Sequence, residues 1–391
     1  MAIACRLVTS PHELDAVADK WADLVADSQT NYPTCAPQWQ LPWWRVLAPR
    51  QQRELFVLCV ESKQGLLGFA PFTRRRVRYH RSMRVNRLEL FGCGDDEADM
   101  VCSCYASILA RRGHEEDVAE ALGEYLSQSK DWDELSIPEA ANHDRVGPML
   151  EQELRTRGLH TRMTSPGSTY AIDLPGSWDE YVKSLSKKGR RLVRRSARDF
   201  QSWAGDSETL RHADKPDELA EAYYVLRDLN RERWADVAHG AVKSDAFDRF
   251  HLEMLPRLGE RGAARISWLE GQGKPLAALY MIIWNKRCYA YQAGRSVSAP
   301  KELRPGIVLH GYAIRDAIER GENAYDMLCG SSRYKMELGA TPRPLIGFHA
   351  WKPSLRVHLC IVADEALAFM RGIKRRRRER DRCTEPTTDA Q

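Results

Sequence analysis

The sequence predicts an α/β protein with mixed sheets, in which one fold is used twice as two tandem domains. The chain has 391 residues, more than one average domain contains. Short apolar runs typical of strands alternate with segments of helical periodicity. Each half also places a hairpin, a further strand, a helix and then a short strand headed by an acidic residue, Asp133 in the first half and Asp326 in the second.

The domain junction is expected in the segment 164–176, which is rich in Ser, Gly and Pro. We therefore expect an N-terminal domain at 1–165 and a C-terminal domain at 166–370. The residues 371–391 are polar and basic without a packing pattern, and we expect a disordered tail there.

Helices and strands alternate in the expected N-terminal domain. Apolar residues recur at three- and four-residue spacing from Leu14 to Leu24, which predicts an amphipathic helix. Further strands are expected at 56–60, 66–72, 87–91 and 134–137, and helices at 118–126 and 145–157. Gly158 is expected to end the last of these helices.

The second half is expected to begin with a capped helix. Ser177 and Glu180 form a capping box, which we expect to start the helix that carries a basic block at 187–198. The remaining helices are expected at 217–234, 246–258 and 305–320, and the strands at 264–268, 276–284, 287–293, 324–328 and 345–351.

Composition excludes several classes of protein. With 43% hydrophobic and 29% charged residues the chain is typical of a globular protein, and its longest apolar stretch, 275–284, is too short to span a bilayer. The N-terminus lacks the pattern of a signal peptide, so a cytoplasmic protein with reduced cysteines is expected. Cys93, Cys102 and Cys104 lie close in sequence, but no second Cys/His pair follows at zinc-finger spacing, so no metal site is expected.

Positive charge is concentrated in three blocks. Residues 74–87, 187–198 and 371–382 carry +7, +7 and +6, whereas the whole chain carries only +5. Such concentration is typical of a protein that handles phosphates or an anionic surface. In the second block the side chains Lys187, Arg191, Arg194 and Arg198 share one helix face. This face is either a solvated surface or a binding site for a polyanion, namely donor phosphates, an RNA backbone or an anionic glycan, and the tail either stays solvated or contacts an anionic membrane.

The helix expected at 305–320 has a distinctive beginning. Pro305 suits the first helical position, and Gly306 lets a ligand approach the backbone closely. Unpaired amides at a helix N-terminus attract anions, and Lys301 and Arg304 lie beside them in the sequence. The segment therefore predicts a phosphate site, although a purely structural helix begins in the same way.

The order of elements in the second half resembles the GNAT N-acyltransferase core: a strand, a gap, a phosphate-binding helix, a strand and then a Tyr. More particularly, the sequence resembles double-GNAT proteins of the cellulose-biosynthesis type, which are distant relatives of the Fem peptidyltransferases. The first half matches only through its strand pattern and "PQWQLPWW" at 37–44, so its domain is expected to be degenerate. The segments that carry the resemblance are "WDEYVKSLSKKGRRLVRRSARDF" (178–200), "LNRERWADVAHG" (229–240), 265–294 and "RPGIVLHGYAIRDAIERGENAYDMLCGSSRYK" (304–335).

The resemblance implies roles for individual residues. Asp326 would accept a proton from the acceptor, and Tyr334 would protonate the leaving thiolate. Asp326 could instead cap its strand or pair with Lys335 or Arg333, and Tyr334 could simply pack in the last turn. The donor phosphates would lie on Arg304, Gly306, Ile307 and Lys301, and the acceptor side would be formed by Arg295, Trp234, Arg231 and Lys335, with core packing the alternative for Trp234.

The function expected from the resemblance is transfer of an acyl group, most simply acetyl, from a CoA-type thioester to an amine or hydroxyl. The acceptor would belong to polysaccharide or cell-envelope metabolism, and acyl-CoA would be a co-substrate rather than a tightly bound cofactor. A typical GNAT pyrophosphate loop carries two closely spaced glycines, whereas this chain has only Gly306. An acyl carrier or aminoacyl-tRNA donor, as in a Fem-like transferase, and a non-catalytic binding protein therefore remain open.

Overall fold

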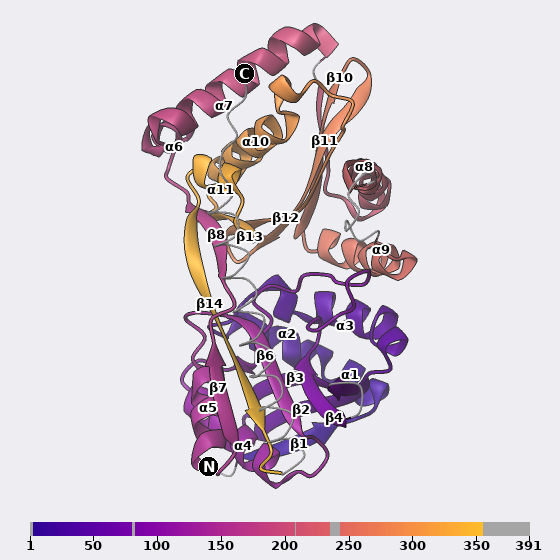
Figure 1. Ribbon diagram of the computed structural model, residues 1–391, viewed down its shortest axis with the longest axis vertical. Coiled ribbons are helices and arrows are strands. Elements are labelled where there is room, and N and C mark those ends of the chain that lie inside the picture. Colours follow the sequence, from indigo (N-terminus) through magenta and orange to yellow (C-terminus); the bar gives the residue numbers. More distant parts are fainter. Residues whose placement is uncertain (1–2, 80–82, 208, 235–242, 355–391) are drawn as a thin grey trace, which may run out of the picture.

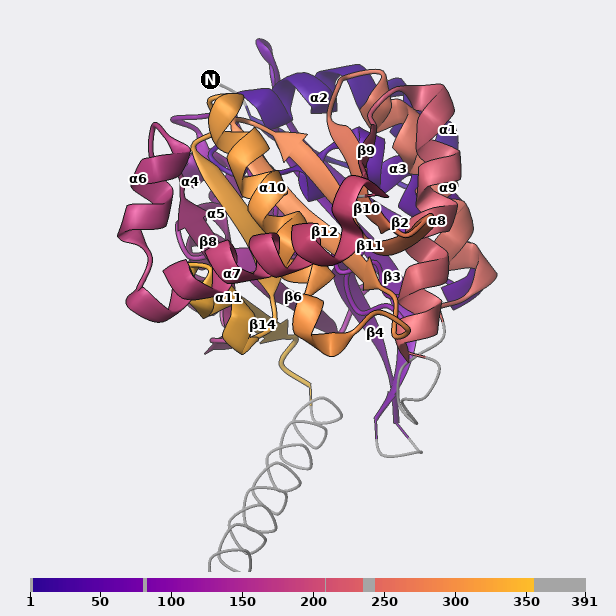
Figure 2. The same ribbon diagram turned by 90° about the horizontal axis from the view of Figure 1, so that it is seen from above.

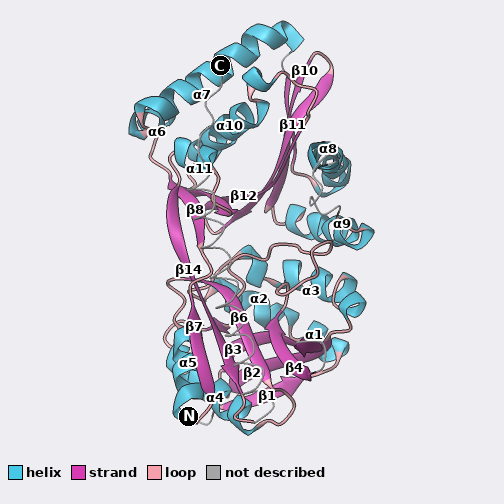
Figure 3. Ribbon diagram, viewed as in Figure 1, coloured by secondary structure: helices cyan, strands magenta, loops and turns pink. Residues whose placement is uncertain are grey.

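Two sheets follow one another along the long axis of the molecule (Figure 1), in a computed structural model that describes residues 3–79, 83–207, 209–234 and 243–354. The basic tail expected at 371–391 lies outside the described residues. Within them the strands join in one continuous order, β1-β2-β3-β4-β6-β14-β8-β13-β12-β11-β10-β9. Helices cover both faces of each sheet (Figure 3), as the alternation of helices and strands predicted.

The N-terminal sheet is sandwiched between two groups of helices. Val57 and Cys59 of β2 point into the core formed with α1 to α3, whereas Phe56 and Leu58 point into the core formed with α4 and α5. The strands are β1 (Ala4–Val8), β2 (Glu54–Ser62), β3 (Gly65–Tyr79), β4 (Met83–Leu90), β5 (Leu109–Ala110), β6 (Glu134–Ala141) and β7 (His160–Thr164). The helices are α1 (Pro11–Ala16), α2 (Ala18–Ala26), α3 (Pro37–Val46), α4 (Glu115–Gln128) and α5 (Val146–Thr156).

The C-terminal sheet is covered in the same way. Ala278 and Tyr280 of β11 face the core that contains α8 and α9, and Leu279 and Met281 face the core that contains α7 and α10. The strands are β8 (Ser168–Asp173), β9 (Thr209–Ala213), β10 (Ala264–Gly271), β11 (Lys274–Trp284), β12 (Arg287–Arg295), β13 (Ala324–Cys329) and β14 (Thr341–Trp351). The helices are α6 (Trp178–Ser184), α7 (Lys187–Ala204), α8 (Pro216–Trp234), α9 (Asp245–Gly259), α10 (Pro305–Glu319) and α11 (Arg333–Glu337).

The two sheets repeat one topology, which confirms the predicted fold class. In the first half β2, β3 and β4 form an antiparallel meander, α4 follows, and β6 then pairs parallel with β4 over three residue pairs. In the second half β10, β11 and β12 form the meander, α10 follows, and β13 pairs parallel with β12, again over three pairs. Helices α6 and α7, which precede the second copy, have no counterpart before β1 among the described residues.

The last strand joins the two sheets. Residues 341–344 of β14 pair with β8 in the C-terminal sheet. In the N-terminal sheet, residues 345–351 pair with β6 around an irregularity at 347, and residues 347–351 pair with β7. The end of the second repeat is therefore inserted into the first. This continuous strand, together with the core that α3 and α9 share, holds the two halves against one another.

One local expectation was wrong. The capping box at Ser177 starts α6, a helix of 7 residues, and not the helix of the basic block. That helix, α7, begins separately at Lys187, where the Ser186 hydroxyl accepts a hydrogen bond from the Gly189 amide at 3.1 Å. The chain breaks between the helices because Leu185 is extended, and Arg190 donates to the carbonyls of Lys183 and Leu185 at 2.9 and 2.7 Å.

Candidate functional site

The gap expected between two parallel strands opens directly after Asp326. Tyr289 of β12 pairs with Asp326 of β13, and beyond this pair the two strands separate. A bulge at Tyr291 helps to turn β12 away, because Tyr280 of β11 pairs with Gln292 and its neighbour pairs with Ala290. Helix α10 connects the two strands and begins near the open end of this gap.

The N-terminus of α10 offers free space and carries no acidic residue in its first turn. Arg304 is its N-cap residue, with a left-handed φ of 49°, and Pro305 occupies the first helical position. A Cβ atom added to Gly306 would meet no atom within 4 Å, so space for a ligand lies against this backbone. These features are those expected of a helix N-terminus that binds an anion.

The equivalent helix of the first half is built differently. Helix α4 begins with Glu115, Glu116 and Asp117, and the Glu115 carboxylate accepts a hydrogen bond from the Gly113 amide at 2.9 Å. These carboxylates already neutralise the positive end of the helix dipole and would repel a phosphate. Of the two repeats, only the second therefore presents a helix start suited to a phosphorylated donor.

A cavity of about 700 Å³ lies between α7, the start of α10 and α11. Figure 2 shows α7 lying across α10, and the two helices pack against one another. Two arginines of the lining, Arg191 and Arg304, form no ion pair with any other described residue. The lining carries five cationic and three acidic side chains among Lys188, Arg191, Leu192, Arg195, Ser196, Asp199, Glu302, Arg304, Ile307, Arg333, Tyr334 and Glu337.

The other cations of the cavity are paired. Glu337 accepts from both Lys188, at 2.7 Å, and Arg333, at 2.8 Å, and Arg195 pairs with Asp199 at 2.9 Å. The unpaired positive charge is thus that of Arg191 on α7 and Arg304 at the start of α10. Two uncompensated guanidinium groups on either side of a cavity can hold a phosphate or pyrophosphate by bidentate hydrogen bonds.

Helix α7 can form one wall of the cavity because Gly189 allows it to approach α11. A Cβ atom at Gly189 would lie 2.3 Å from the carbonyl oxygen of Glu337, so no other residue fits there without moving the backbone. The face of α7 that lines the cavity is not the predicted basic stripe. Of that stripe only Arg191 lines the cavity, whereas Lys187, Arg194 and Arg198 are exposed to solvent.

Tyr334 lines the cavity from α11. Its ring packs 5.6 Å from the ring of His310, which is buried and lies 2.8 Å from the hydroxyl of Tyr325. Burial lowers the pKa of His310 to about 4, so this imidazole is neutral at physiological pH. The Tyr334 ring therefore rests on an uncharged, well-packed support.

Asp326 is fully buried and does not line this cavity. Its carboxylate accepts hydrogen bonds from the Leu328 amide at 2.9 Å and from the Tyr105 hydroxyl at 2.8 Å, and it pairs with Arg287 at 3.4 Å. Burial raises the pKa of the Asp326 carboxyl, while its hydrogen bonds and the charge of Arg287 oppose the rise. The cation that Asp326 pairs with is thus Arg287, and neither Lys335 nor Arg333.

Lys335 braces the end of β13. Its ammonium group is buried and donates to the carbonyls of Met327, Leu328 and Cys329 at 2.6, 3.1 and 2.7 Å. These three hydrogen bonds satisfy the carbonyl groups at the end of the strand, where Leu328 adopts a left-handed φ of 54°. Lys335 is absent from the lining of the 700 Å³ cavity, where a substrate role would have placed it.

The structure does not bring the other expected acceptor residues to this cavity. Arg295 is exposed at the end of β12 and is not part of the lining. Arg231 pairs with Asp248 of α9 at 2.8 Å, on the face of the sheet opposite to α10. The side chains of Trp234 and Lys301 lie outside the described part of the structure.

A group of side chains that sequence reasoning missed surrounds Asp326 at the junction of the two halves. The Tyr105 hydroxyl, which bonds Asp326, also lies 2.6 Å from the Thr169 hydroxyl. The ring of Tyr105 stacks on Tyr32 at 4.5 Å, and the Tyr32 hydroxyl lies 2.9 Å from the His143 ring. No local pattern marks these residues, because each comes from a different loop or strand and only folding brings them together.

Comparison with known proteins finds a family resemblance in the second half of the chain. Residues 187–336 match a family model described as an acetyltransferase (GNAT) domain. The match begins with α7 and ends in α11, so it contains both walls of the cavity and the start of α10. None of the curated proteins compared with the chain matches it.

Solved structures with low sequence identity share the fold over nearly the whole chain. FemX aligns with a TM-score of 0.58 at 12% identity, covering 88% of this chain and 98% of FemX. The C-terminal DUF2156 domain of a putative lysylphosphatidylglycerol synthetase from Agrobacterium fabrum aligns with a TM-score of 0.50 at 12% identity, covering 91% of this chain and 95% of that domain. A Bacteroides thetaiotaomicron protein of unknown function aligns with a TM-score of 0.51 at 9% identity, over 86% and 97% of the two chains. At such identities the similarity establishes the fold alone.

In the part of the chain that the structure describes, every helix is too short or too polar to cross a bilayer.

Proposed function

We propose that this protein is an acyltransferase that moves an acyl group, most simply acetyl, from a CoA-type thioester to an amine or hydroxyl acceptor. The observation that carries the proposal is the cavity at the start of α10, where Arg191 and Arg304 remain unpaired among the described residues. A CoA-type donor carries a pyrophosphate, which matches two guanidinium groups facing a helix N-terminus. The GNAT-domain match over 187–336 supports the same reaction class.

The donor would be held by its phosphates. Arg304 and the backbone at Gly306 and Ile307 would contact the pyrophosphate, with Lys301 preceding them in the chain. Arg191 would approach the same group from α7, across the cavity. The thioester would extend into the gap between β12 and β13, where GNAT-type chemistry takes place.

Acyl transfer then needs one proton removed from the acceptor and one delivered to the leaving thiolate. The acceptor nitrogen or oxygen attacks the thioester carbonyl, a new amide or ester bond forms, and the C–S bond breaks. Tyr334, at the cavity wall, would protonate the thiolate. Asp326 would receive the acceptor proton, and because Asp326 is buried this transfer would run through water or through the Tyr105 hydroxyl.

We further propose that the C-terminal domain, at 166–370, is the catalytic one and that the N-terminal domain, at 1–165, binds no acyl donor. The acidic first turn of α4 supports this division, because it opposes phosphate binding at the equivalent position. By the double-GNAT resemblance of the cellulose-biosynthesis type, the acceptor would come from polysaccharide or cell-envelope metabolism.

The thermal midpoint of the purified chain tests the donor class. A ligand present at one hundred times its dissociation constant adds about 2.7 kcal/mol to the free energy of unfolding, which is a shift of several degrees. Acetyl-CoA, longer acyl-CoAs and free CoA should each raise the midpoint, and 3′-dephospho-CoA should retain most of the effect because it keeps the pyrophosphate. The absence of a shift with any of these compounds would exclude a CoA-type donor.

A second candidate is a Fem-like transferase that takes its aminoacyl group from tRNA. The observation that favours it is the exposed row Lys187, Arg194 and Arg198 on α7, which lies outside the cavity and could contact an RNA backbone. FemX shares the fold with this chain, which is compatible with this candidate. Binding of tRNA that weakens steeply with salt and is lost in Arg194→Glu would support it, whereas the acyl-CoA proposal expects Arg194→Glu to leave donor binding unchanged.

A further inference from the structure

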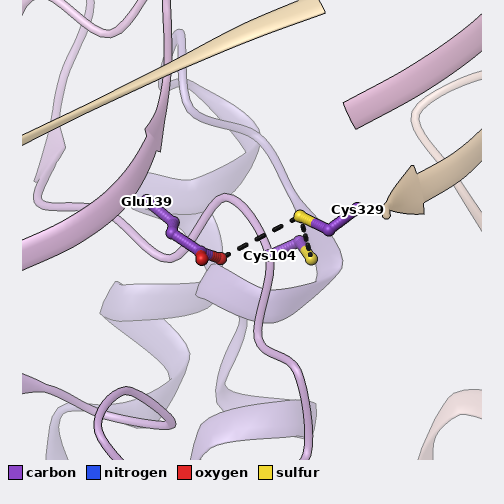
Figure 4. A group of neighbouring side chains, drawn as sticks. All are labelled: Cys104, Glu139 and Cys329. Carbon is purple, nitrogen blue, oxygen red and sulfur yellow. Dashed lines mark hydrogen bonds between the residues drawn. The ribbon is translucent and has the colours of Figure 1, made fainter. Parts of the chain in front are cut away.

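Two cysteines and a glutamate from distant parts of the chain meet where the two halves join (Figure 4). The Cys104 and Cys329 sulfurs lie 3.1 Å apart, although the residues are separated by 225 positions in the sequence. The Glu139 carboxylate lies 4.0 Å from the Cys329 sulfur, and all three ligand atoms are within 4.8 Å of one another. Cys329 ends β13, Glu139 belongs to β6, and Cys104 lies in the loop between β4 and β5.

The three groups are a donor set for a borderline-soft divalent cation. Thiolates and carboxylates both bind Zn²⁺, and three protein ligands leave the fourth tetrahedral position to water. A Zn²⁺ ion with bonds of about 2.3 Å to sulfur holds its two sulfurs roughly 3.8 Å apart. The present separation of 3.1 Å reaches that value through a small rotation of one cysteine side chain.

The charges around the cluster also suit a divalent ion. Two thiolates and a carboxylate carry three negative charges, and the ion and the buried ammonium of Lys335 would together balance them. Lys335 donates to the Cys329 carbonyl at 2.7 Å, so it also fixes the backbone of one ligand. Ligands that are held in place by such surrounding contacts bind metals more tightly.

A disulfide between Cys104 and Cys329 explains the cluster less well. A disulfide has no need of the third group, and a carboxylate beside two sulfurs discourages the thiolate that must attack to form one. A metal ion, by contrast, uses all three groups.

We propose that Cys104, Cys329 and Glu139 bind one Zn²⁺-type divalent cation, which ties the loop of the first half to the end of β13. No local sequence pattern marks this site, because Cys104 is its only member in the group formed by Cys93, Cys102 and Cys104. Asp326 lies three residues before Cys329, and Tyr105 directly follows Cys104. The cation therefore fixes both partners of the Tyr105–Asp326 hydrogen bond, whether or not the protein transfers acyl groups.

The experiment uses Co²⁺ as the probe, because thiolate-to-cobalt charge transfer gives absorption in the near ultraviolet. The full chain, reduced and freed of metal, should bind one equivalent of Co²⁺ with this band, and Zn²⁺ should displace it. Cys104→Ser and Cys329→Ser should lose the band, and Glu139→Gln should bind Co²⁺ about 10- to 100-fold more weakly. The matched control is Cys5→Ser, a half-buried cysteine of β1, which should behave as the unaltered chain.

A second measurement protects the test against variants that fail to fold. In the unaltered chain, Zn²⁺ should slow alkylation of Cys329, mapped by peptide mass, and leave alkylation of Cys5 unchanged. A chain that binds no Co²⁺, or whose thiolate band survives in both Cys104→Ser and Cys329→Ser, would overturn the proposal. So would a Cys104–Cys329 disulfide, seen as the loss of two hydrogens from the mass of the unreduced protein, that excludes Co²⁺ until it is reduced.

Discussion

The hydroxyl of Tyr105 donates a 2.8 Å hydrogen bond to the carboxylate of Asp326 across 221 residues of sequence. Tyr105 belongs to a loop of the first half, and Asp326 ends the parallel pairing in the sheet of the second. The candidate proton acceptor of one repeat is thus held by the other. The first half therefore supports the site even though its own helix α4 is unsuited to a donor.

Removal of this hydrogen bond should destabilise the protein. Tyr105→Phe leaves a buried carboxylate with one donor fewer, which costs about 1–3 kcal/mol of the free energy of unfolding. Tyr125→Phe is the control, since the Tyr125 hydroxyl forms no hydrogen bond with another described residue and its ring packs at the edge of Phe56. Urea denaturation of the three proteins measures the difference, and equal stability of both variants would show that the Tyr105 contact contributes nothing.

A buried carboxyl in the first half should make stability depend on pH. Burial raises the pKa of Asp144 from 3.8 to about 6 in the folded protein. Between about pH 4 and 6 the folded state keeps a proton that the unfolded state has lost, so stability falls as pH rises through this window. Over this whole window the free energy of unfolding falls by about 3 kcal/mol.

Asp144→Asn removes this titration while keeping an oxygen that can accept from the Val146 amide, as Asp144 does at 3.0 Å. Denaturation midpoints at several pH values should therefore show a flatter profile between about pH 4 and 6 in the variant than in the unaltered chain. Parallel profiles would show that Asp144 titrates at its ordinary pKa.

Two glycines in the helices that form the cavity, α7 and α10, should respond differently to the same change. Gly189→Ala places a Cβ atom 2.3 Å from the Glu337 carbonyl, so it should destabilise the chain by about 1–3 kcal/mol and displace α7. Gly306→Ala meets no atom within 4 Å, so its stability should be unchanged or slightly higher. If the donor lies against Gly306, Gly306→Ala should nevertheless bind CoA more weakly. Unchanged binding would show that the donor does not contact the backbone at Gly306.

The role of Tyr334 can be separated from donor binding. Tyr334→Phe keeps the ring that packs on His310 and removes only the hydroxyl. If Tyr334 protonates the leaving thiolate, turnover should fall by about 10²- to 10⁴-fold while the dissociation constant of CoA stays the same. Turnover equal to that of the unaltered chain would assign the proton to another group.

The fold could be predicted from sequence to the extent that its signals are local. The strands of the hairpins and the helices from Pro216 and Pro305 follow from periodicity and capping, which act over a few residues. The capping box at Ser177 was assigned to the wrong helix because two non-helical residues, Leu185 and Ser186, divide α6 from α7. The crossing of β14 between sheets has no local signal, since its pairing partners β6, β7 and β8 lie far away in the sequence.

The candidate site, too, could be predicted only where its residues carry a local sequence signal. Arg304, Gly306, Ile307 and Tyr334 lie close in sequence, and the structure places three of their side chains, those of Arg304, Ile307 and Tyr334, in one cavity. The contribution of α7 was only partly predictable, because the helix face that meets the cavity is fixed by its contact with α11 and not by charge. Tyr105, Arg287 and Glu139 could not be found, since their importance arises from contacts between the two halves.

The central claim is that a phosphorylated donor binds between α7 and the start of α10, and the most direct measurement is the dissociation constant of CoA for two matched variants. Arg191 and Arg194 lie three residues apart on α7, and only Arg191 lines the cavity. Reversal of a charge beside a phosphate should cost at least 1.4 kcal/mol, about a factor of ten, so Arg191→Glu should bind CoA at least tenfold more weakly. Arg194→Glu should match the unaltered chain. Equal effects of the two reversals, or none from Arg191→Glu, would contradict the account.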